Sequence, residues 1–192
     1  MRDVKIEVLC EDRAQEWFLR ELLERMGFRR RNIYVQISPP SRGAAEAFVR
    51  REYAGVLRRV RRANISQRKN ERPLTALVVM VDGDAHGVTA RKKQLSDALV
   101  VAVEPEVGDE AVALMIPTWS IETWLAWLCG WGDVNETMRL KHDAEYQRRV
   151  RQAQVTTVLA AKNWLEGPST GELLSLKDGR RELQRVRRNK GK

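Results

Sequence analysis

Four acidic residues stand where apolar, strand-like segments of the sequence end. Glu11 follows VKIEVLC, Glu122 follows AVALMIPTWSI, and the segment LTALVVMV ends in Asp82, Gly83 and Asp84. If these segments are parallel strands, right-handed crossovers return the chain to one edge of the sheet, where the carboxylates meet. Gathered carboxylates repel one another unless a cation lies among them, and hard oxygen ligands favour Mg²⁺ or Mn²⁺. The sequence therefore predicts a metal site with four ligands: Glu11, Asp82, Asp84 and Glu122.

The DGD sequence is the centre of this prediction. Asp82 and Asp84 lie two residues apart in an extended exit from a strand, so both carboxylates can face the same way. Such a pair can hold one ion or bridge two, and two ions roughly 3.5 to 4 Å apart stabilise the attacking and leaving oxygens of a phosphodiester. Ordinary alternatives exist: DGD is a common turn sequence, and Glu11 and Glu122 would also suit helix N-termini. The coincidence at three strand ends favours a catalytic site.

The hydrophobic pattern predicts which elements position these residues. Strands are expected over residues 4–10, 32–37, 74–81 and 111–116. Helices are expected between the Asp12 cap and Gly27, over 44–63, through 90–99, from the Ser120 cap to 128, over 144–165 and over 179–188, with a connector at 66–72. This alternation predicts an α/β fold with a four-stranded, mainly parallel sheet flanked by helices. We expect residues 1–132 to form the catalytic domain and residues 133–192 a helical C-terminal extension packed on it.

The chain is strongly basic, with a formal net charge of +9 and a pI of about 10.0. This balance suits a polyanionic partner, and together with an acidic site it favours nucleic acid, DNA more than RNA. Trp119 and Trp131 could stack bases, whereas Trp124 and Trp127 lie close to an apolar helix stripe and are expected to pack. The apolar runs are too short or too interrupted to span a bilayer, so no membrane partner is expected. The N-terminus lacks the long apolar core of a secretory signal, which favours a cytoplasmic protein.

The acidic segments also resemble a known family. VLCED and VVMVDGD are similar to the Toprim domain, in which a strand ending in glutamate precedes a strand ending in DxD. IPTWSIETWL resembles the SxxE-type element of the OLD (overcoming lysogenisation defect) family of Toprim nucleases, although Ser120 and Glu122 are only two positions apart. The resemblance covers residues 4–128 and implies a parallel sheet, divalent-metal dependence and phosphodiester cleavage or transfer. It also implies a late lysine, for which Lys177 in LLSLKDGRREL is the candidate; an ordinary surface lysine is the alternative.

These features predict a stand-alone, Mg²⁺- or Mn²⁺-dependent nuclease. The chain has no GxxxxGK[ST] phosphate loop of its own, and the OLD resemblance suggests a separately encoded ATPase partner and a role in defence against phage or plasmid DNA. Asp82 and Asp84 would bind the metal, and Glu11 would complete its shell or act as general base. Two alternatives stay open. One is a non-catalytic nucleic-acid-binding or regulatory subunit with a degenerate site; the other is phosphoryl transfer on a small molecule, which leaves the basic helices without a role.

Overall fold

Four parallel strands form the centre of the protein. The computed structural model describes residues 4–39, 45–70, 74–108, 110–149, 161, 163–167 and 170–188. The strands are β1 (Ile6–Cys10), β2 (Ile33–Ile37), β3 (Ala76–Met80) and β4 (Val112–Met115). They are arranged in the order β2-β1-β3-β4, and every neighbouring pair is parallel. The predicted α/β class is confirmed, and the sheet is consistent with the one that the Toprim resemblance implies.

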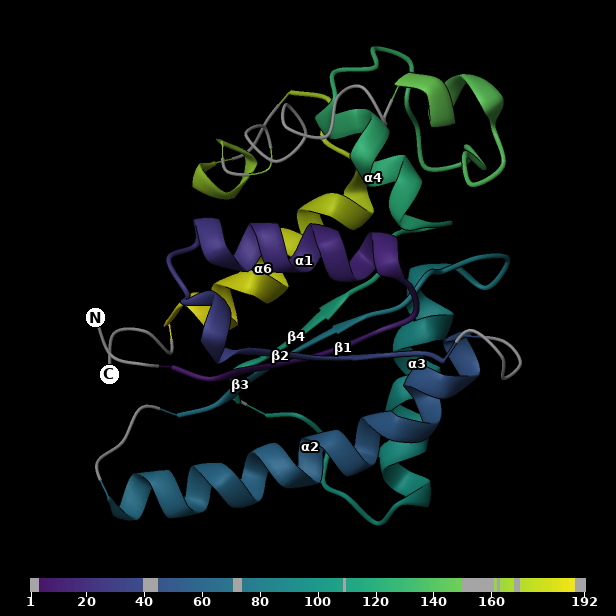
Figure 1. The fold of residues 1–192 in the computed structure, drawn as a ribbon. Helices are drawn as coiled ribbons and strands as arrows, with labels where there is room; N and C mark the ends of the chain where they lie inside the picture. Colours follow the sequence, from purple (N-terminus) through teal and green to yellow (C-terminus); the bar gives the residue numbers. More distant parts are fainter. Residues whose placement is uncertain are drawn as a thin grey trace.

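Helices cover both faces of this sheet (Figure 1). One face carries α1 (Arg13–Arg25), α4 (Ile121–Leu128) and α6 (Leu174–Arg188), while the other carries α2 (Ala45–Lys69) and α3 (Gly87–Val101). A short 3-10 helix, η1 (Arg30–Asn32), precedes β2. The helix predicted over 144–165 falls partly outside the described residues, and within them 144–149 and 163–166 are helical.

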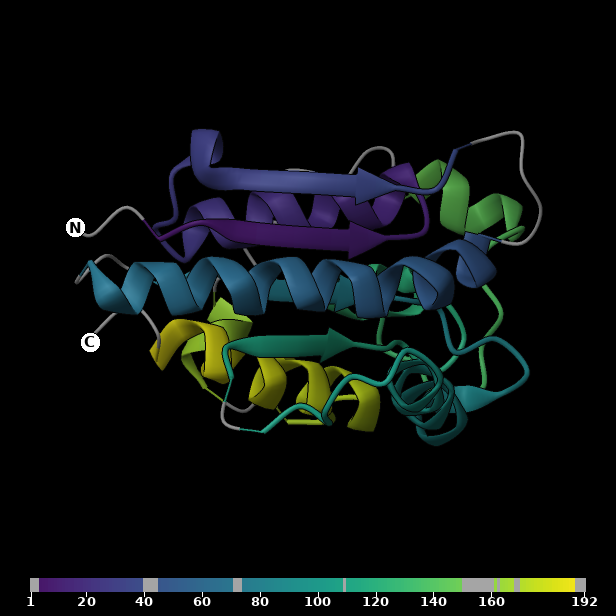
Figure 2. The ribbon, with the colours of Figure 1, turned by 90° about the horizontal axis from the view of Figure 1, so that it is seen from below.

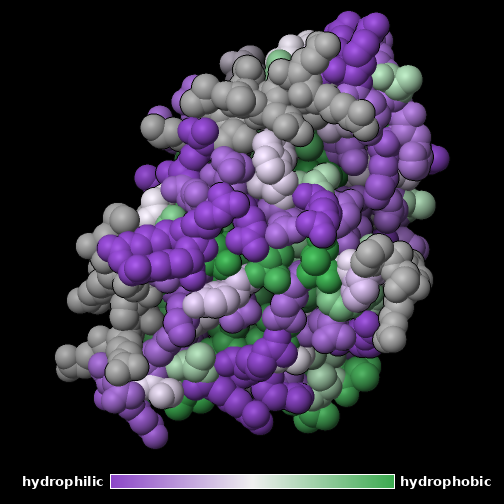
Figure 3. All heavy atoms as spheres, in the orientation of Figure 1, coloured by the Kyte–Doolittle hydropathy of each residue, from purple (hydrophilic) through white to green (hydrophobic). Residues whose placement is uncertain are grey.

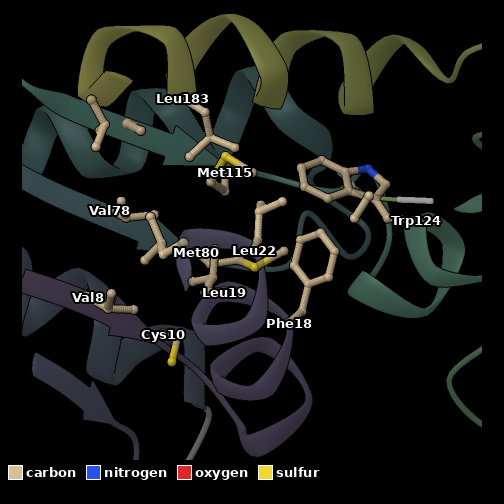
Figure 4. Packing of buried hydrophobic residues seen from close by; sticks show 14 of the residues in the cluster. Val8, Cys10, Phe18, Leu19, Leu22, Val78, Met80, Met115, Trp124 and Leu183 are labelled. Carbon is tan, nitrogen blue, oxygen red and sulfur yellow. The ribbon is translucent and has the colours of Figure 1, made fainter. Parts of the chain in front are cut away.

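Strict alternation along the buried strands divides the core into two layers. On β3, Val78 and Met80 pack toward α1, α4 and α6, whereas Leu77 and Val79 pack toward α2 and α3. This is the period-two pattern of a strand buried on both faces. On the first side, Phe18 of α1 meets Trp124 of α4 edge-on, with ring centroids 6.5 Å apart (Figure 4). Parity along β3 therefore decides the side of the sheet to which each following side chain points.

Two helix boundaries differ from the predictions. Helix α2 continues to Lys69, so residues 66–69 of the connector predicted at 66–72 are helical, and residues 71 and 72 lie outside the described residues. The amides of Asn64 and Gln67 bond the backbone of Thr75 and hold the last turns of α2 in place. Helix α6 begins at Leu174 and passes through Gly179, which was predicted as its start. A Cβ on Gly179 would lie 2.7 Å from the Trp124 ring, so this glycine permits close packing and marks no boundary.

The carboxyl ends of all four strands lie at one edge of the sheet. Figure 2 shows β1, β2 and β4 running in the same direction, with their arrowheads together. The loops that leave β1 and β3 at this edge carry Glu11, Asp82 and Asp84, and the loop after β4 leads to Glu122 in the first turn of α4. Ligands of open parallel sheets bind beyond this edge. None of the helices in the described part of the chain has the length and apolarity of a bilayer-spanning segment.

Candidate active site

Glu11 and Asp82 are in direct contact at the carboxyl edge of the sheet. The backbone N–H of Asp82 donates a hydrogen bond to Oε1 of Glu11 at 3.0 Å, which joins the ends of β1 and β3. Asp82 is fully buried, and Glu11 is only 5% exposed. The structure thus brings together the two acids that the sequence placed at the ends of these strands.

Helix α1 is tied to both acids through one glutamine. Asp12 caps α1 as predicted, because its Oδ1 accepts the N–H groups of Ala14 and Gln15. The buried amide of Gln15 accepts the N–H of Glu11 at 3.0 Å and donates to Oδ1 of Asp82 at 2.8 Å. In a capping box, the Gln15 side chain would accept the N–H of Asp12; here it accepts that of Glu11, one residue earlier. The glutamine therefore fixes the strand end and the Asp82 carboxylate relative to each other.

The carboxylate of Asp82 also caps α4. Asp82 continues the parity of Val78 and Met80, so its side chain points to the side of the sheet where α1 and α4 begin. Its Oδ1 accepts the N–H of Ile121, the first residue of α4, at 3.1 Å. Ser120 occupies the predicted N-cap position, but its hydroxyl makes no capping bond. An aspartate from another strand end replaces it, and a negative charge is stabilised there by the helix N-terminus.

Burial and mutual repulsion raise the pKa of both acids. The pKa of Glu11 rises to about 8, mainly through burial and then through the charge of Asp82, while the hydrogen bond from the Asp82 N–H opposes this rise. Burial also raises the pKa of Asp82, to about 7; the nearby Lys141 ammonium lowers it, and Glu122 and Asp12 raise it further. At neutral pH the cluster therefore holds protons that a cation would displace.

Glu122 joins this cluster from the start of α4. It is 7% exposed, and its charge is the strongest carboxylate influence on the pKa of Asp82. Its Oε2 is buried and has no hydrogen-bond partner among the described residues, as is also true of the Ser120 hydroxyl. A buried carboxylate oxygen without a partner is costly. This cost makes Glu122 a candidate ligand for a cation.

Lys141 is the cation that the sequence analysis missed. Its Nζ lies 3.3 Å from Oδ2 of Asp82 and 4.0 Å from Oδ2 of Asp12. The residue lies between α4 and the helical residues 144–149, in irregular chain where no periodicity or motif marks it. The predicted lysine, Lys177, instead lies on α6 with an exposed side chain and, among the described residues, contacts none of the clustered acids. Its proposed place in the site is not supported by this arrangement.

Asp84 departs from the prediction that it faces the same way as Asp82. The chain leaves the extended conformation after Gly83, and Asp84 has a φ of 49°. Its Oδ2 pairs with Nη2 of Arg91 at 3.1 Å, and its side chain is half exposed. Arg91 lies on α3 and is itself buried, with further bonds to Glu46 and to the carbonyl of Asp82. Asp84 is thus directed toward the α2 and α3 side of the sheet.

The donor set can be tested against the predicted Mg²⁺ or Mn²⁺. Within the described residues, no three His, Cys, Asp or Glu side chains are grouped tightly enough to form a ready-made metal site. Three observations nevertheless fit such an ion. The oxygen donors are hard ligands, and the pKa values of Glu11 and Asp82 are raised. Oε2 of Glu122 makes no hydrogen bond in the part of the chain that the structure describes. Glu11, Asp82 and Glu122 would hold the ion, after Lys141 moves away from Asp82.

Fewer basic side chains are available to bind a polyanion than the net charge implies, because some of them form ion pairs within the protein. On α2, Arg58 and Arg61 both pair with Glu104 and so stabilise the fold. Arg59 and Arg62 on the same helix are exposed and have no ion pair within the described residues. The side of the protein seen in Figure 3 is largely hydrophilic, with hydrophobic residues reaching it in patches. Only part of the arginine content is therefore available to a polyanion.

Comparison with known proteins adds no further assignment. No protein-family model matches the chain, and no curated protein or solved structure matches it significantly. The Toprim and OLD-like resemblance of VLCED and VVMVDGD stays a prediction from the sequence. The functional argument therefore depends on the geometry of the cluster formed by Glu11, Asp82, Glu122 and Lys141.

Proposed function

We propose that the chain is a divalent-metal-dependent nuclease that cleaves phosphodiester bonds of DNA or RNA at the carboxyl edge of the sheet. The proposal extends to Mg²⁺ or Mn²⁺ as cofactor and to DNA as the favoured substrate. It also includes a cytoplasmic role in defence against phage or plasmid DNA, with a separately encoded ATPase as partner. The defence role and the ATPase partner depend on the OLD resemblance alone, and the cytoplasmic location depends on the N-terminal sequence.

One observation carries the proposal: three acids from three strand ends form a buried, mutually repelling cluster. Glu11 bonds the backbone of Asp82, and Glu122 raises the pKa of the Asp82 carboxyl. Oε2 of Glu122 is buried and makes no hydrogen bond to any described residue, so it remains available to a cation. Perturbed carboxyl groups at the ligand-binding edge of a parallel sheet support a functional site. The net charge of +9 supports a polyanionic substrate.

The residues of the cluster would have distinct roles. A bound divalent ion would supply Lewis-acid polarisation of the scissile phosphate and activation of water. Glu11 would complete the metal shell or, once ionised, serve as general base; with a pKa of about 8 it keeps its proton near neutral pH in metal-free buffer. Lys141 is 44% exposed, so its ammonium can leave Asp82 and contact the phosphate. Gln15 would keep Asp82 in place throughout, because both ends of its amide are bonded.

Cleavage assays test this proposal. Plasmid, linear DNA and structured RNA should be cut in Mn²⁺ or Mg²⁺ and left intact in EDTA. Asp82→Asn should abolish cutting while the folded chain persists, as shown by circular dichroism. Cleavage that survives in EDTA or in the Asp82→Asn variant overturns the proposal.

A second function is favoured by one observation. Lys141 already neutralises Oδ2 of Asp82, as expected of a degenerate site that binds nucleic acid without cutting it. In that case, binding to DNA or RNA would persist in EDTA and no metal would produce cleavage. The same assays separate the two functions.

A further inference from the structure

Trp119 stands beside the acidic cluster in the loop between β4 and α4. Its carbonyl accepts the N–H of Asp84 at 2.9 Å, and the neighbouring Pro117 carbonyl accepts the N–H of Gly83, also at 2.9 Å. A Cβ on Gly83 would lie 2.6 Å from the Pro117 oxygen and closer still to that of Thr118. The two loops thus approach too closely for any other residue at position 83. Trp119 is therefore held at a fixed place relative to Asp82, three residues before Glu122.

The indole of Trp119 is stacked against an arginine. The guanidinium carbon of Arg139 lies 3.9 Å from the ring centroid, which is close for a cation–π contact. Arg139 is exposed and has no carboxylate partner within the described residues, so its N–H donors are available to a phosphate. Lys141, two residues later, reaches Asp82. One short segment thus places a cation on the indole and another in the acidic cluster.

The other tryptophan predicted to stack bases has a structural role instead. Trp131 contacts Tyr146 edge-on at 6.0 Å and packs on the small core cluster of Ala126, Leu140 and Tyr146. Trp124 is fully buried, and its Nε1 donates to the Ser175 hydroxyl. Trp131 also has a cation over its ring, Arg149 at 5.2 Å, but Arg149 is paired with Glu145. Trp119 has the closer contact, and it lies on the loop that leads to Glu122.

We propose that Trp119 and Arg139 form a stacking platform for an unpaired nucleotide, and that the substrate of the acidic site is single-stranded nucleic acid. This inference rests on the proposed nuclease function and narrows its substrate. A duplex offers protein side chains only the edges of its bases, whereas an unpaired base exposes its flat faces to aromatic rings and guanidinium planes. The platform would hold the base while Arg139 binds the adjoining phosphate. The strand would then pass the cluster of Glu11, Asp82 and Glu122.

Equilibrium binding in EDTA tests the platform, using a fluorescent single-stranded oligonucleotide of mixed sequence and a hairpin duplex of the same composition. Trp119→Leu keeps an apolar side chain but loses the ring, and should weaken single-strand binding by about fivefold or more, the lower limit for loss of one base stack. Trp119→Phe retains a ring and should bind nearly as well as the wild type. Duplex binding should change little in either variant.

Arg139 gives a second, independent arm of the experiment. Arg139→Gln should weaken single-strand binding, and Arg139→Lys should restore it only in part, because lysine keeps the charge without the planar group. The proposal is overturned if Trp119→Leu and Arg139→Gln bind the single strand as the wild type does, or if they lose single-strand and duplex affinity equally. EDTA prevents cleavage, so this result is independent of whether the chain cuts nucleic acid. If only the nuclease proposal is wrong, the variants should show the expected loss of single-strand binding, and the wild type should show no metal-dependent cleavage.

Discussion

The backbone N–H of Asp82 donates a hydrogen bond to the carboxylate of Glu11, across 71 positions of sequence. This bond joins two acids that burial and mutual repulsion keep difficult to ionise, with pKa values of about 8 for Glu11 and about 7 for Asp82. The fold therefore tolerates a cluster that is stable only when protons, a lysine or another cation neutralise it.

Replacing Glu11 by Gln should flatten the dependence of stability on pH in metal-free buffer. The pKa of Glu11 rises from 4.5 to about 8 on folding, so the folded chain binds this proton more tightly than the unfolded chain does. The resulting stabilisation is fully present below pH 4.5 and is lost as the pH rises through about 8. The melting temperature of the wild type should therefore fall across this window more steeply than that of Glu11→Gln. Equal slopes would show that the carboxyl of Glu11 is not perturbed.

Replacing Lys141 or Lys177 by Met tests which of the two lysines acts at the acidic cluster. Lys141→Met removes the cation that competes with a metal for Asp82, so Mn²⁺ should bind more tightly, by up to about fivefold for a half-exposed ion pair. Cleavage should nevertheless decrease if Lys141 contacts the phosphate. Lys177→Met, on the exposed side of α6, should change neither quantity. Calorimetric titration and initial cleavage rates measure the two effects, and identical behaviour of the variants contradicts the placement of Lys141.

Gly83→Ala should destabilise the protein by about 1–3 kcal/mol, the usual cost of overpacking. The added Cβ would press on the carbonyl oxygens of Pro117 and Thr118 and force the loops after β3 and β4 apart. Gly55→Ala is the control, because nothing lies within 4 Å of its Cβ position on α2. That change should stabilise the chain by about 0.4–1 kcal/mol. Urea denaturation measures both, and a neutral Gly83→Ala would disprove the close approach.

Exposed and ion-paired arginines on α2 should have different effects when replaced: the first on nucleic-acid binding, the second on stability. Replacing Arg59 and Arg62 together with Gln should reduce the salt dependence of nucleic-acid binding by a slope of about 2, if each contacts one phosphate. The fold should be unaffected, since both side chains are exposed. Replacing Arg58 and Arg61, which pair with Glu104, should instead lower the melting temperature. An unchanged salt slope in the first double variant would remove α2 from the binding surface.

The hydrophobic periodicity of the sequence was sufficient to predict the sheet and the acids at its strand ends. The apolar runs before Glu11, Asp82 and Glu122 are buried parallel strands or lead directly from them, and the chain returns these acids to one edge. Residue spacing could not reveal where the side chains point after the strand ends. Asp84 was expected beside Asp82, but the backbone turns at Gly83 and Arg91 holds its carboxylate elsewhere.

The missed features depend on tertiary contacts that leave no local signal. Lys141 comes from irregular chain, and only the folded structure brings it to Asp82. Local propensity predicts a helix boundary at Gly179, but this residue lies inside α6, where the Trp124 ring leaves no room for a Cβ. The last turns of α2 likewise form because Gln67 bonds Thr75, a contact that the polar composition of the segment does not indicate.

Direct measurement of Mn²⁺ binding by calorimetry or electron paramagnetic resonance tests the central claim, that Glu11, Asp82 and Glu122 form a metal-binding cluster. The wild type should bind Mn²⁺, and Asp82→Asn should abolish this binding. Asp84→Asn should retain most of it, because Arg91 already holds the Asp84 carboxylate. A wild-type chain that binds no Mn²⁺, or an Asp82→Asn variant that binds it equally well, would contradict the account.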